Sequence, residues 1–231
     1  MTDHTVTSYD TELRELNDLV VRMGDAVSGQ LRAVVGVQKS GDTSGAQRII
    51  GADAAVDDLQ VMIEEKIVQV IAKRQPMAID LRTLIAMLKL TTDLERIGDL
   101  AKNNAKRVLA TSGQTHNAEV SANLERLGRL VIDQVGSAVR AFHDRDDDLA
   151  CNVWARDAEI DTMQTSIFRE LLTYMMEDPR NIGYCTHLMF CARNLERIGD
   201  HATNIVEQVH YVVTGRSMPL DRPRGTSDLP V

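Results

Sequence analysis

Aromatic residues are scarce in this 231-residue chain, since phenylalanine, tryptophan and tyrosine together make up 3% of it. A core built without them must be filled by aliphatic side chains, which is typical of a helical protein. Cysteine is scarce as well, with Cys151, Cys185 and Cys191 occurring singly and in no Cys-x-x-Cys pair. An odd number of scattered cysteines argues against a disulfide framework, so we expect a chain of the reducing cytoplasm with buried thiols.

Net positive charge and long apolar runs are also missing. Acidic residues number 34 against 26 basic ones, and the net charge of −8 argues against a nucleic-acid backbone as the main partner. A cation or a basic protein surface fits this charge better. No apolar run reaches the length of about 18 residues that a membrane-spanning helix needs. We therefore expect contact with a membrane only indirectly, through partner proteins.

One short block of sequence occurs twice. Leu-Glu-Arg-Ile-Gly-Asp spans residues 94–99 and again 195–200, and since 196 − 95 = 101, one unit of the chain is repeated. Each copy continues with acids and an amide at four-residue steps: Glu95, Asp99 and Asn103 in the first, Glu196, Asp200 and Asn204 in the second. On a helix these side chains stack along one face. Like charges at that spacing destabilise a helix, so a cation is expected nearby.

A further set of acids is duplicated at a spacing of 104 residues: Asp53 and Asp57 in the first copy, Asp157 and Asp161 in the second. Two neighbouring helices with such acids would form a carboxylate cage suited to Mg, Mn, Fe or Zn. We take Asp57 and Asp161 as additional candidate ligands. The acids could instead form salt bridges with Arg96 and Arg197, or a solvated face, and the spacing alone leaves these alternatives open.

Apolar residues recur at helical spacing through most of the chain, with breaks at residues 40–42, Pro76, Gly113 and Pro179. The pattern predicts six helices, at residues 9–37, 44–73, 77–110, 118–143, 146–177 and 181–214. Short connections favour an all-α fold of two tandem three-helix bundles. We expect the first repeat at residues 8–112, the second at 117–214 and a disordered tail at 215–231.

The third expected helix carries a ridge that begins apolar, with Leu81 and Ile85, and becomes acidic at the first motif copy. A glycine accompanies the acids in each copy, Gly98 in the first and Gly199 in the second. A residue without a side chain allows a neighbouring helix or a ligand to approach closely. We therefore expect close contacts at both glycines.

Four segments together resemble the PhoU family: Arg74-Gln75-Pro76, Asp80-Leu81-Arg82, the paired Leu-Glu-Arg-Ile-Gly-Asp blocks and the run from Asp200 to Glu207. The resemblance covers residues 8–214. It implies a cytoplasmic, often homodimeric protein of two three-helix bundles related by pseudo-twofold symmetry. It also implies a negative regulator of phosphate uptake and of the phosphate-starvation response. The implied partners are the ATPase subunit of the phosphate ABC transporter and a phosphate-sensing histidine kinase.

The same resemblance implies a metal surface. Some members of the PhoU family bind multinuclear iron, zinc or other divalent metals on their Glu-x-x-x-Asp residues. Carried over to this sequence, the metal ligands are Glu95, Asp99, Asn103, Glu196, Asp200 and Asn204. Asp57 and Asp161 remain our own additions to this set.

The two copies are not equivalent. Lys106 stands where the second copy has Glu207, and Leu100 stands where it has His201. Lys106 lies one helical step beyond Asn103, so it could supply a built-in cation where the second copy needs a bound one. We therefore predict tighter metal binding in the second half. His201 is displaced from the acidic stripe and is expected at the surface or behind the ligands, rather than on the metal.

Two other classes of protein remain as alternatives: a metal-binding or metal-free helical adaptor of another pathway, and a carboxylate-bridged di-metal enzyme. Ferritin-like enzymes of the second class use Glu-x-x-His on two helices of a bundle, which neither Leu-Glu-Arg-Ile-Gly-Asp copy forms. The sequence also contains no phosphate loop, no His-Glu-x-x-His and no Gly-x-Ser-x-Gly. We therefore expect a regulator that is not an enzyme.

Overall fold

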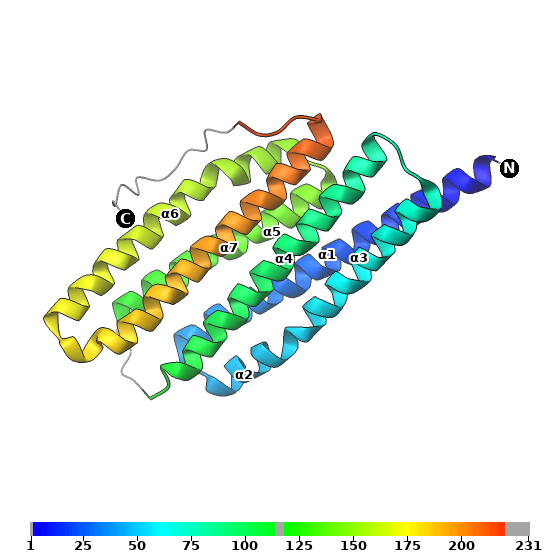
Figure 1. The fold of residues 1–231 in the computed structure, drawn as a ribbon. Helices are drawn as coiled ribbons and strands as arrows, with labels where there is room; N and C mark the ends of the chain where they lie inside the picture. Colours follow the sequence, from blue (N-terminus) through cyan, green and yellow to red (C-terminus); the bar gives the residue numbers. More distant parts are fainter. Residues whose placement is uncertain (1, 114–117, 220–231) are drawn as a thin grey trace.

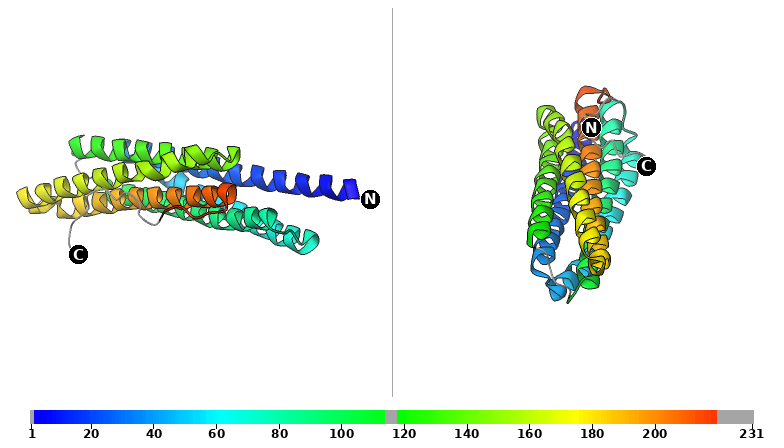
Figure 2. Two further views of the ribbon diagram at one scale, coloured as in Figure 1. Left: turned by 90° about the horizontal axis from the view of Figure 1, so that it is seen from above. Right: turned by 90° about the vertical axis from the view of Figure 1, so that its left-hand side faces the viewer.

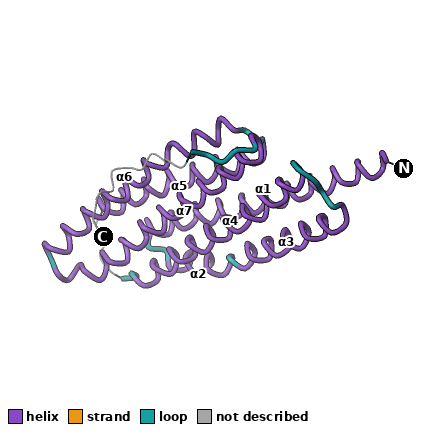
Figure 3. Tube along the Cα trace, turned by 45° about the horizontal axis from the view of Figure 1, so that its top comes forward, coloured by secondary structure: helices purple, strands orange, loops and turns teal. Residues whose placement is uncertain are grey.

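The computed structural model describes residues 2–113 and 118–219, and within these ranges every regular element is a helix. The helices are α1 (Thr2–Ser40), α2 (Thr43–Ala52), α3 (Ala54–Arg74), α4 (Ile79–Ala110), α5 (Ala118–Asp144), α6 (Asp147–Glu177) and α7 (Ile182–Thr214), with a short 3₁₀ helix, Pro179–Asn181, before α7 (Figure 1). The described connections between them are short (Figure 3). The expected all-α fold of two helical repeats is confirmed.

The helices form two bundles, α1 to α4 and α5 to α7, that lie side by side (Figure 1). α1 packs against α5 and α4 packs against α7, so these four long helices make up the centre of the molecule. α3 and α6 lie at its two outer sides. The view from above (Figure 2, left) shows that α1 and α5 lie behind α4 and α7 when the molecule is oriented as in Figure 1. This arrangement places the two motif helices, α4 and α7, next to each other and antiparallel.

Apolar spacing explains the packing of α1. Leu16, Val20, Met23, Val27 and Leu31 follow one another at steps of three or four residues, and all five are fully buried. Such steps return to the same face of a helix, which here faces the other central helices. Burying each of these side chains contributes about 1.5–3 kcal/mol relative to exposure.

The prediction of one helix at 44–73 was wrong, because the structure divides it at Asp53 into α2 and α3. The backbone of Asp53 stays in the right-handed region, at φ −61° and ψ −36°, so the chain direction changes little. The amide of Val56 bonds to the carbonyl of Asp53 at 2.8 Å, a tighter turn than that of an α-helix. Asp53 is buried there, and its side chain turns to a partner on α4.

Corresponding helices in the two bundles begin with the same kind of capping residue. Asp42 accepts a hydrogen bond from the amide of Gly45 at 2.9 Å, and Asp146 accepts one from the amide of Leu149 at the same distance. These are N-caps, which satisfy amides that have no partner inside the helix. Since 146 − 42 = 104, the capping residues follow the spacing of the duplicated acids. The duplication therefore extends from the acids to the ends of the helices.

The contact between α1 and α5 is reciprocal. A side chain at Gly24 would place its Cβ 2.7 Å from Val139, and one at Gly128 would place it 2.5 Å from Val35. Gly24 corresponds to Gly128 and Val35 to Val139, because both pairs differ by 104. Each helix therefore inserts a valine against the glycine of the other, as two copies related by a twofold axis do.

We expect Gly24→Ala to destabilise the protein by about 1–3 kcal/mol, because the added methyl group collides with Val139 in a packed interface. The matched control is Gly29→Ala on the same helix, since nothing lies within 4 Å of a Cβ there. That change should stabilise α1 by about 0.5–1 kcal/mol. Urea denaturation measures both. Equal effects of the two alanines would contradict the close contact.

Part of the expected tail lies within the described residues. α7 ends at Gly215, whose φ of 75° is the left-handed conformation that glycine adopts readily. Met218 follows in a non-helical segment and is 8% exposed. Residues 220–231, on which the rest of that prediction falls, lie outside the described residues, as does most of the expected boundary between the halves.

Candidate functional site

The first acid cluster consists of Asp53, Asp57, Glu95 and Asp99, and it lies where α4 passes the junction of α2 and α3. Lys102, on α4, extends its ammonium group to Asp53 and Asp99 and forms an ion pair with each. Asp53 is only 4% exposed, so the ammonium group supplies the charge that this buried carboxylate needs. The first cluster therefore contains its own cation.

The pKa shifts in the first cluster reflect this pairing. Hydrogen bonds with Asp53 and then Asp99 raise the pKa of Lys102, and the hydrogen bond from Lys102 lowers the pKa of Asp99. Glu95 differs, since burial and then repulsion from Asp99 raise its pKa. Arg96 Nε lies 3.4 Å from Glu95 Oε2, but the arginine side chain is 58% exposed, so this contact is weak. The expected arginine salt bridge thus forms at the edge of the cluster, while Lys102 lies at its centre.

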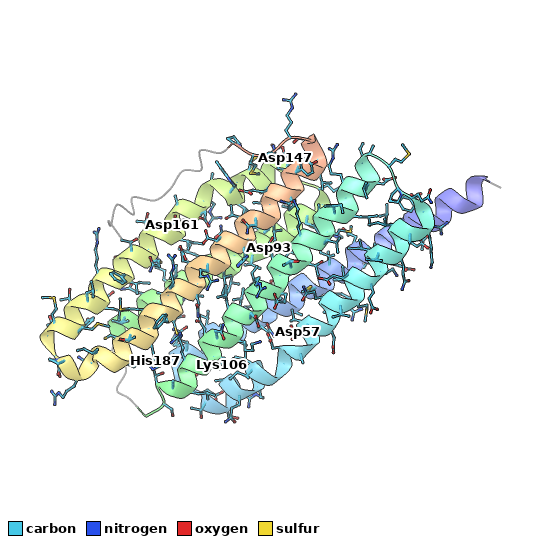
Figure 4. All side chains as sticks on the ribbon, in the orientation of Figure 1. Asp57, Asp93, Lys106, Asp147, Asp161 and His187 are labelled. Carbon is cyan, nitrogen blue, oxygen red and sulfur yellow. The ribbon has the colours of Figure 1, made fainter. Side chains whose placement is uncertain are left out.

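The second acid cluster consists of Asp157, Asp161, Glu196 and Asp200, and it lies between α6 and α7. Figure 4 shows Asp161 on α6 and Asp57 on α3, on opposite sides of the central helices. The two clusters are therefore separate sites, one in each bundle, and each lies where a motif helix meets its outer neighbour.

Thr203 stands in the second bundle where the first has Lys102, because 203 − 102 = 101. Its hydroxyl lies 3.2 Å from Asp157 Oδ1, and Gln134 Nε2 donates to the same oxygen at 2.9 Å. Asp157 is 2% exposed. Neutral donors therefore stand at the position that the ammonium group occupies in the first cluster.

Glu196 is a buried acid of the second cluster that is only partly compensated. It is 9% exposed, and its Oε2 atom has no hydrogen-bond partner among the described residues. Arg193 donates to the other carboxylate oxygen at 2.9 Å, but the side chain of Arg193 is 60% exposed. Burial, and then repulsion from Asp200, raises the pKa of Glu196 to about 7. An unpaired carboxylate oxygen beside further acids is the environment that a bound cation would neutralise.

The two clusters differ in how well they suit a metal ion. In the first, Lys102 already takes the position of a cation, so the residues present do not fit a metal. In the second, the unpartnered oxygen of Glu196 and the neighbouring carboxylates are the hard donors that Mg, Mn or Fe prefers. No three carboxylates of this cluster bring their oxygens within 4.8 Å of one another in the described structure, so a bound ion would have to draw them together.

The prediction of Lys106 as the built-in cation was wrong. Lys106 is exposed on α4 and forms no ion pair with an acid in the part of the chain that the structure describes (Figure 4). Lys102 has that role because it lies one turn after Asp99 and its side chain also reaches the buried Asp53. Metal binding is still predicted to be tighter in the second half, but the reason is Lys102 rather than Lys106.

Neither predicted amide ligand forms a hydrogen bond with an acid of the clusters among the described residues. Asn103 is exposed, and Asn204 donates to Asp93 Oδ1 on α4 at 3.1 Å. His201 lies close by, with its Nδ1 atom 2.8 Å from the same oxygen of Asp93. Asp93 therefore links α4 to α7 through both residues, at a place between the two clusters (Figure 4). His201 belongs to this contact between the bundles.

Sequence reasoning missed the glutamines of α1 and α5. The Oε1 atoms of Gln30 and Gln134 are buried beside the two clusters and have no hydrogen-bond partner among the described residues. The signal was present, since 134 − 30 = 104 is the spacing of the duplicated acids. Asp53 and Asp157 were part of the expected carboxylate cage, but only Asp57 and Asp161 were taken as ligands. The structure buries Asp53 and Asp157, whereas Asp57 is exposed.

The close approach expected at the two glycines is confirmed. A Cβ at Gly98 would lie 3.3 Å from Gln30 Oε1, and one at Gly199 would lie 3.2 Å from Asp157 Oδ1. Contacts this short leave little room for a side chain. Each glycine therefore lets α4 or α7 pass directly over the polar groups of the neighbouring helices.

Comparison with known proteins identifies this architecture. The family model described as the PhoU domain matches residues 20–108 and again 124–209, which together make up more than half of the chain. The chain belongs to the PhoU family. Each matched segment contains one acid cluster, so the PhoU domain occurs once in each bundle.

Curated and solved relatives cover nearly the whole chain. A phosphate-specific transport system accessory protein PhoU homolog from Caulobacter vibrioides is 45% identical over 224 residues, which cover 97% of each chain. One from Rhizobium meliloti is 44% identical and covers 96% of this chain and 93% of the relative. The crystal structure of PhoU from Pseudomonas aeruginosa, 36% identical, superposes with a TM-score of 0.87 over 90% of this chain and all of that one.

The family sets the class of function. PhoU-family proteins are accessory proteins of phosphate transport and not enzymes, so the di-metal enzyme is set aside and a role in regulating phosphate transport is supported. In the described part of the chain, no helix is long and apolar enough to cross a lipid bilayer.

Proposed function

We propose that this PhoU-family chain is a cytoplasmic negative regulator of phosphate uptake and of the phosphate-starvation response. It acts by binding the ATPase subunit of the phosphate ABC transporter and the phosphate-sensing histidine kinase. The observation that carries the proposal is the match, over almost the full length of both chains, to proteins named as accessories of phosphate-specific transport. Identity of 44–45% across both repeats supports a shared role rather than a shared fold alone.

The ridge of α4 supports recognition of a partner. Ile79, Leu81 and Ile85 are 59%, 38% and 41% exposed, and Met77, just before the helix, is 81% exposed. Contiguous exposed apolar side chains are a common mark of interaction sites. The ridge continues into the first acid cluster, where four carboxylates outnumber the ammonium group of Lys102, and the remaining negative charge would steer a basic partner surface. Exposed apolar side chains and acidic side chains thus lie along one helix, where a partner protein would contact both.

Gene deletion tests this function. In phosphate-rich medium, a strain lacking the gene should derepress its secreted phosphatase, and a plasmid copy should restore repression. A copy with Leu81→Glu and Ile85→Glu should fail to restore it and should lose co-purification with the ATPase subunit. The matched control is Leu172→Glu on α6, because Leu172 is 40% exposed and lies away from the ridge. Intact repression in a deletion strain without a second copy of the gene would contradict the proposal.

Metal binding in the second cluster is part of the proposal, with Mg, Mn, Fe or Zn as the ion. We expect a Glu196→Gln, Asp200→Asn variant to lose Mn²⁺ that the parent protein binds, because it lacks the carboxylates that the ion needs. The matched variant Glu95→Gln, Asp99→Asn should keep it, since Lys102 already takes the position of a cation in the first cluster. Elemental analysis after dialysis measures the bound Mn²⁺. Equal loss from both variants would contradict the difference between the halves.

We also propose that the protein is a homodimer, as the resemblance to the family implies. Light scattering on the purified chain would give twice the chain mass of 25.6 kDa if this holds. A mass equal to that of one chain at micromolar concentration would contradict the proposed dimer.

A further inference from the structure

Three side chains of different chemistry meet at one end of the second bundle, away from both acid clusters. Asp147 is the first residue of α6, Cys151 lies on the same helix, and His210 lies near the end of α7. One ligand atom from each of these residues lies within 4.8 Å of the other two. Figure 4 shows Asp147 beside the C-terminal end of α7. In the described part of the chain, this is the one group of such residues that converges so closely.

We propose that Asp147, Cys151 and His210 form a zinc-binding site. A thiolate, an imidazole and a carboxylate are the donors that zinc uses in proteins, and a soft thiolate disfavours Mg and Ca. Three protein ligands leave the fourth tetrahedral position to water, and Cys151 is exposed to solvent. The site would therefore bind zinc from solution exchangeably.

The fold holds the ligands in place before any ion binds. Asp146 caps α6 and so fixes the position of Asp147 at the start of the helix. Cys151 follows four residues later, which puts it one turn along the same face. The antiparallel α7 brings His210 to that face, where its Nδ1 atom lies 2.6 Å from Asp147 Oδ1. Two helices and a cap thus define the geometry.

Small movements suffice to admit the ion. Ligand atoms about 2.0–2.3 Å from a tetrahedral zinc are about 3–4 Å from one another. The 2.6 Å contact between Asp147 and His210 must therefore open by about 0.4–1.4 Å, and zinc would replace the proton of this hydrogen bond. The Sγ atom of Cys151 already lies within 4.8 Å of both partners, so it too needs only a small movement toward them.

The local charge suits a dication. Asp148 lies next to Asp147, and the two aspartates, after burial, raise the pKa of the Cys151 thiol. A zinc ion would reverse this effect and displace the thiol proton. The C-terminal end of α7 adds the negative end of a helix dipole on the other side of the site.

The site is not a copy of the acid clusters. The positions that correspond to it in the first bundle are Thr43, Gln47 and Leu109, none of which resembles the zinc donors. His210 also lies fourteen residues beyond Glu196 on α7, which is about 20 Å along the helix. The inference therefore does not depend on metal binding by the second acid cluster, nor on the proposed function.

Cobalt tests the proposal, because Co²⁺ occupies zinc sites and gives a near-ultraviolet charge-transfer band only when a thiolate binds it. The full chain, stripped of metal by a chelator, is titrated with Co²⁺ and then with Zn²⁺. We expect the thiolate band to reach the intensity of one thiolate-bound Co²⁺ per chain, and to be lost as Zn²⁺ displaces that ion. The acid clusters contain no sulfur and cannot give this signal. Absence of the band would overturn the proposal.

Variants assign the ligands. Cys151→Ser should abolish the band, whereas Cys185→Ala, on α7, should keep it. Asp147→Asn and His210→Ala should each weaken Zn²⁺ binding by about tenfold or more. Asp148→Asn is the matched control, because it removes the same charge from the same turn without removing a ligand. A band that survives Cys151→Ser, or equal weakening by Asp147→Asn and Asp148→Asn, would overturn the assignment.

Discussion

Replacing Glu196 with glutamine should stabilise the metal-free protein by about 3 kcal/mol at pH 8 and leave its stability nearly unchanged at pH 4. The pKa of Glu196 is raised from 4.5 to about 7 by burial and then by Asp200. At about 1.4 kcal/mol per pH unit, this difference corresponds to about 3 kcal/mol. Glutamine keeps the shape of the side chain and removes the charge that burial disfavours.

The direction of the pH dependence follows from proton binding. Between about pH 4.5 and 7 the unfolded chain has released the proton of Glu196 while the folded protein still holds it. Stability of the parent protein therefore falls as the pH rises through this window and is lowest above it. The variant lacks this group, so the two stability curves should meet in acid and separate toward alkaline pH.

Urea denaturation at several pH values, in the presence of a chelator, measures this separation. Glu95→Gln is the matched control, since the pKa of Glu95 is raised for the same reasons but Glu95 is more exposed. It should give a smaller effect of the same sign. Addition of Mn²⁺ should stabilise the parent protein and not the Glu196→Gln variant. A stability gain that is the same at pH 4 and pH 8 would rule out the raised pKa.

Replacing Lys102 with methionine should destabilise the protein by about 3 kcal/mol at pH 7. The change keeps the length of the side chain but leaves Asp53, which is 4% exposed, without its ion pair. Asp99 loses the same partner. Because Lys102 lowers the pKa of Asp99, its stabilising effect is present at neutral pH and is lost as the pH falls through the acid range. The deficit of the variant should therefore shrink toward pH 3.

Two further variants make this test specific. Lys106→Met removes an exposed lysine from the same helix and should change stability by less than about 0.5 kcal/mol. Adding Asp53→Asn to Lys102→Met should recover part of the loss, because the unpaired buried charge is then gone. If Lys102→Met costs no more than Lys106→Met, the ammonium group is not what neutralises the first cluster.

The repeat made much of the fold predictable. Apolar spacing located the helices, and the duplication of Leu-Glu-Arg-Ile-Gly-Asp predicted two bundles. The break at Asp53 was not predictable in this way, because its backbone remains in the helical region and its side chain pairs with Lys102 on another helix. Contacts between helices, rather than local sequence, decide such a feature.

The same limit applies to the site. Spacing along α4 put Lys106 beside the acidic stripe, but it could not show which lysine reaches across to another helix. The contact of Asp93 with His201 and Asn204 was equally hidden, since it joins two bundles at residues that do not repeat. A duplicated sequence predicts what the halves share, and their mutual contacts need the three-dimensional arrangement.

The reciprocal contacts of Gly24 with Val139 and of Gly128 with Val35 have the form of a subunit interface joined within one polypeptide. In an assembly of two identical subunits, every substitution appears in both sites at once. A single chain is free of that restriction, so a lysine can stand at position 102 while a threonine stands at 203. Covalent linkage of the two repeats is therefore what allows one site to be neutralised permanently while its twin keeps its charge available.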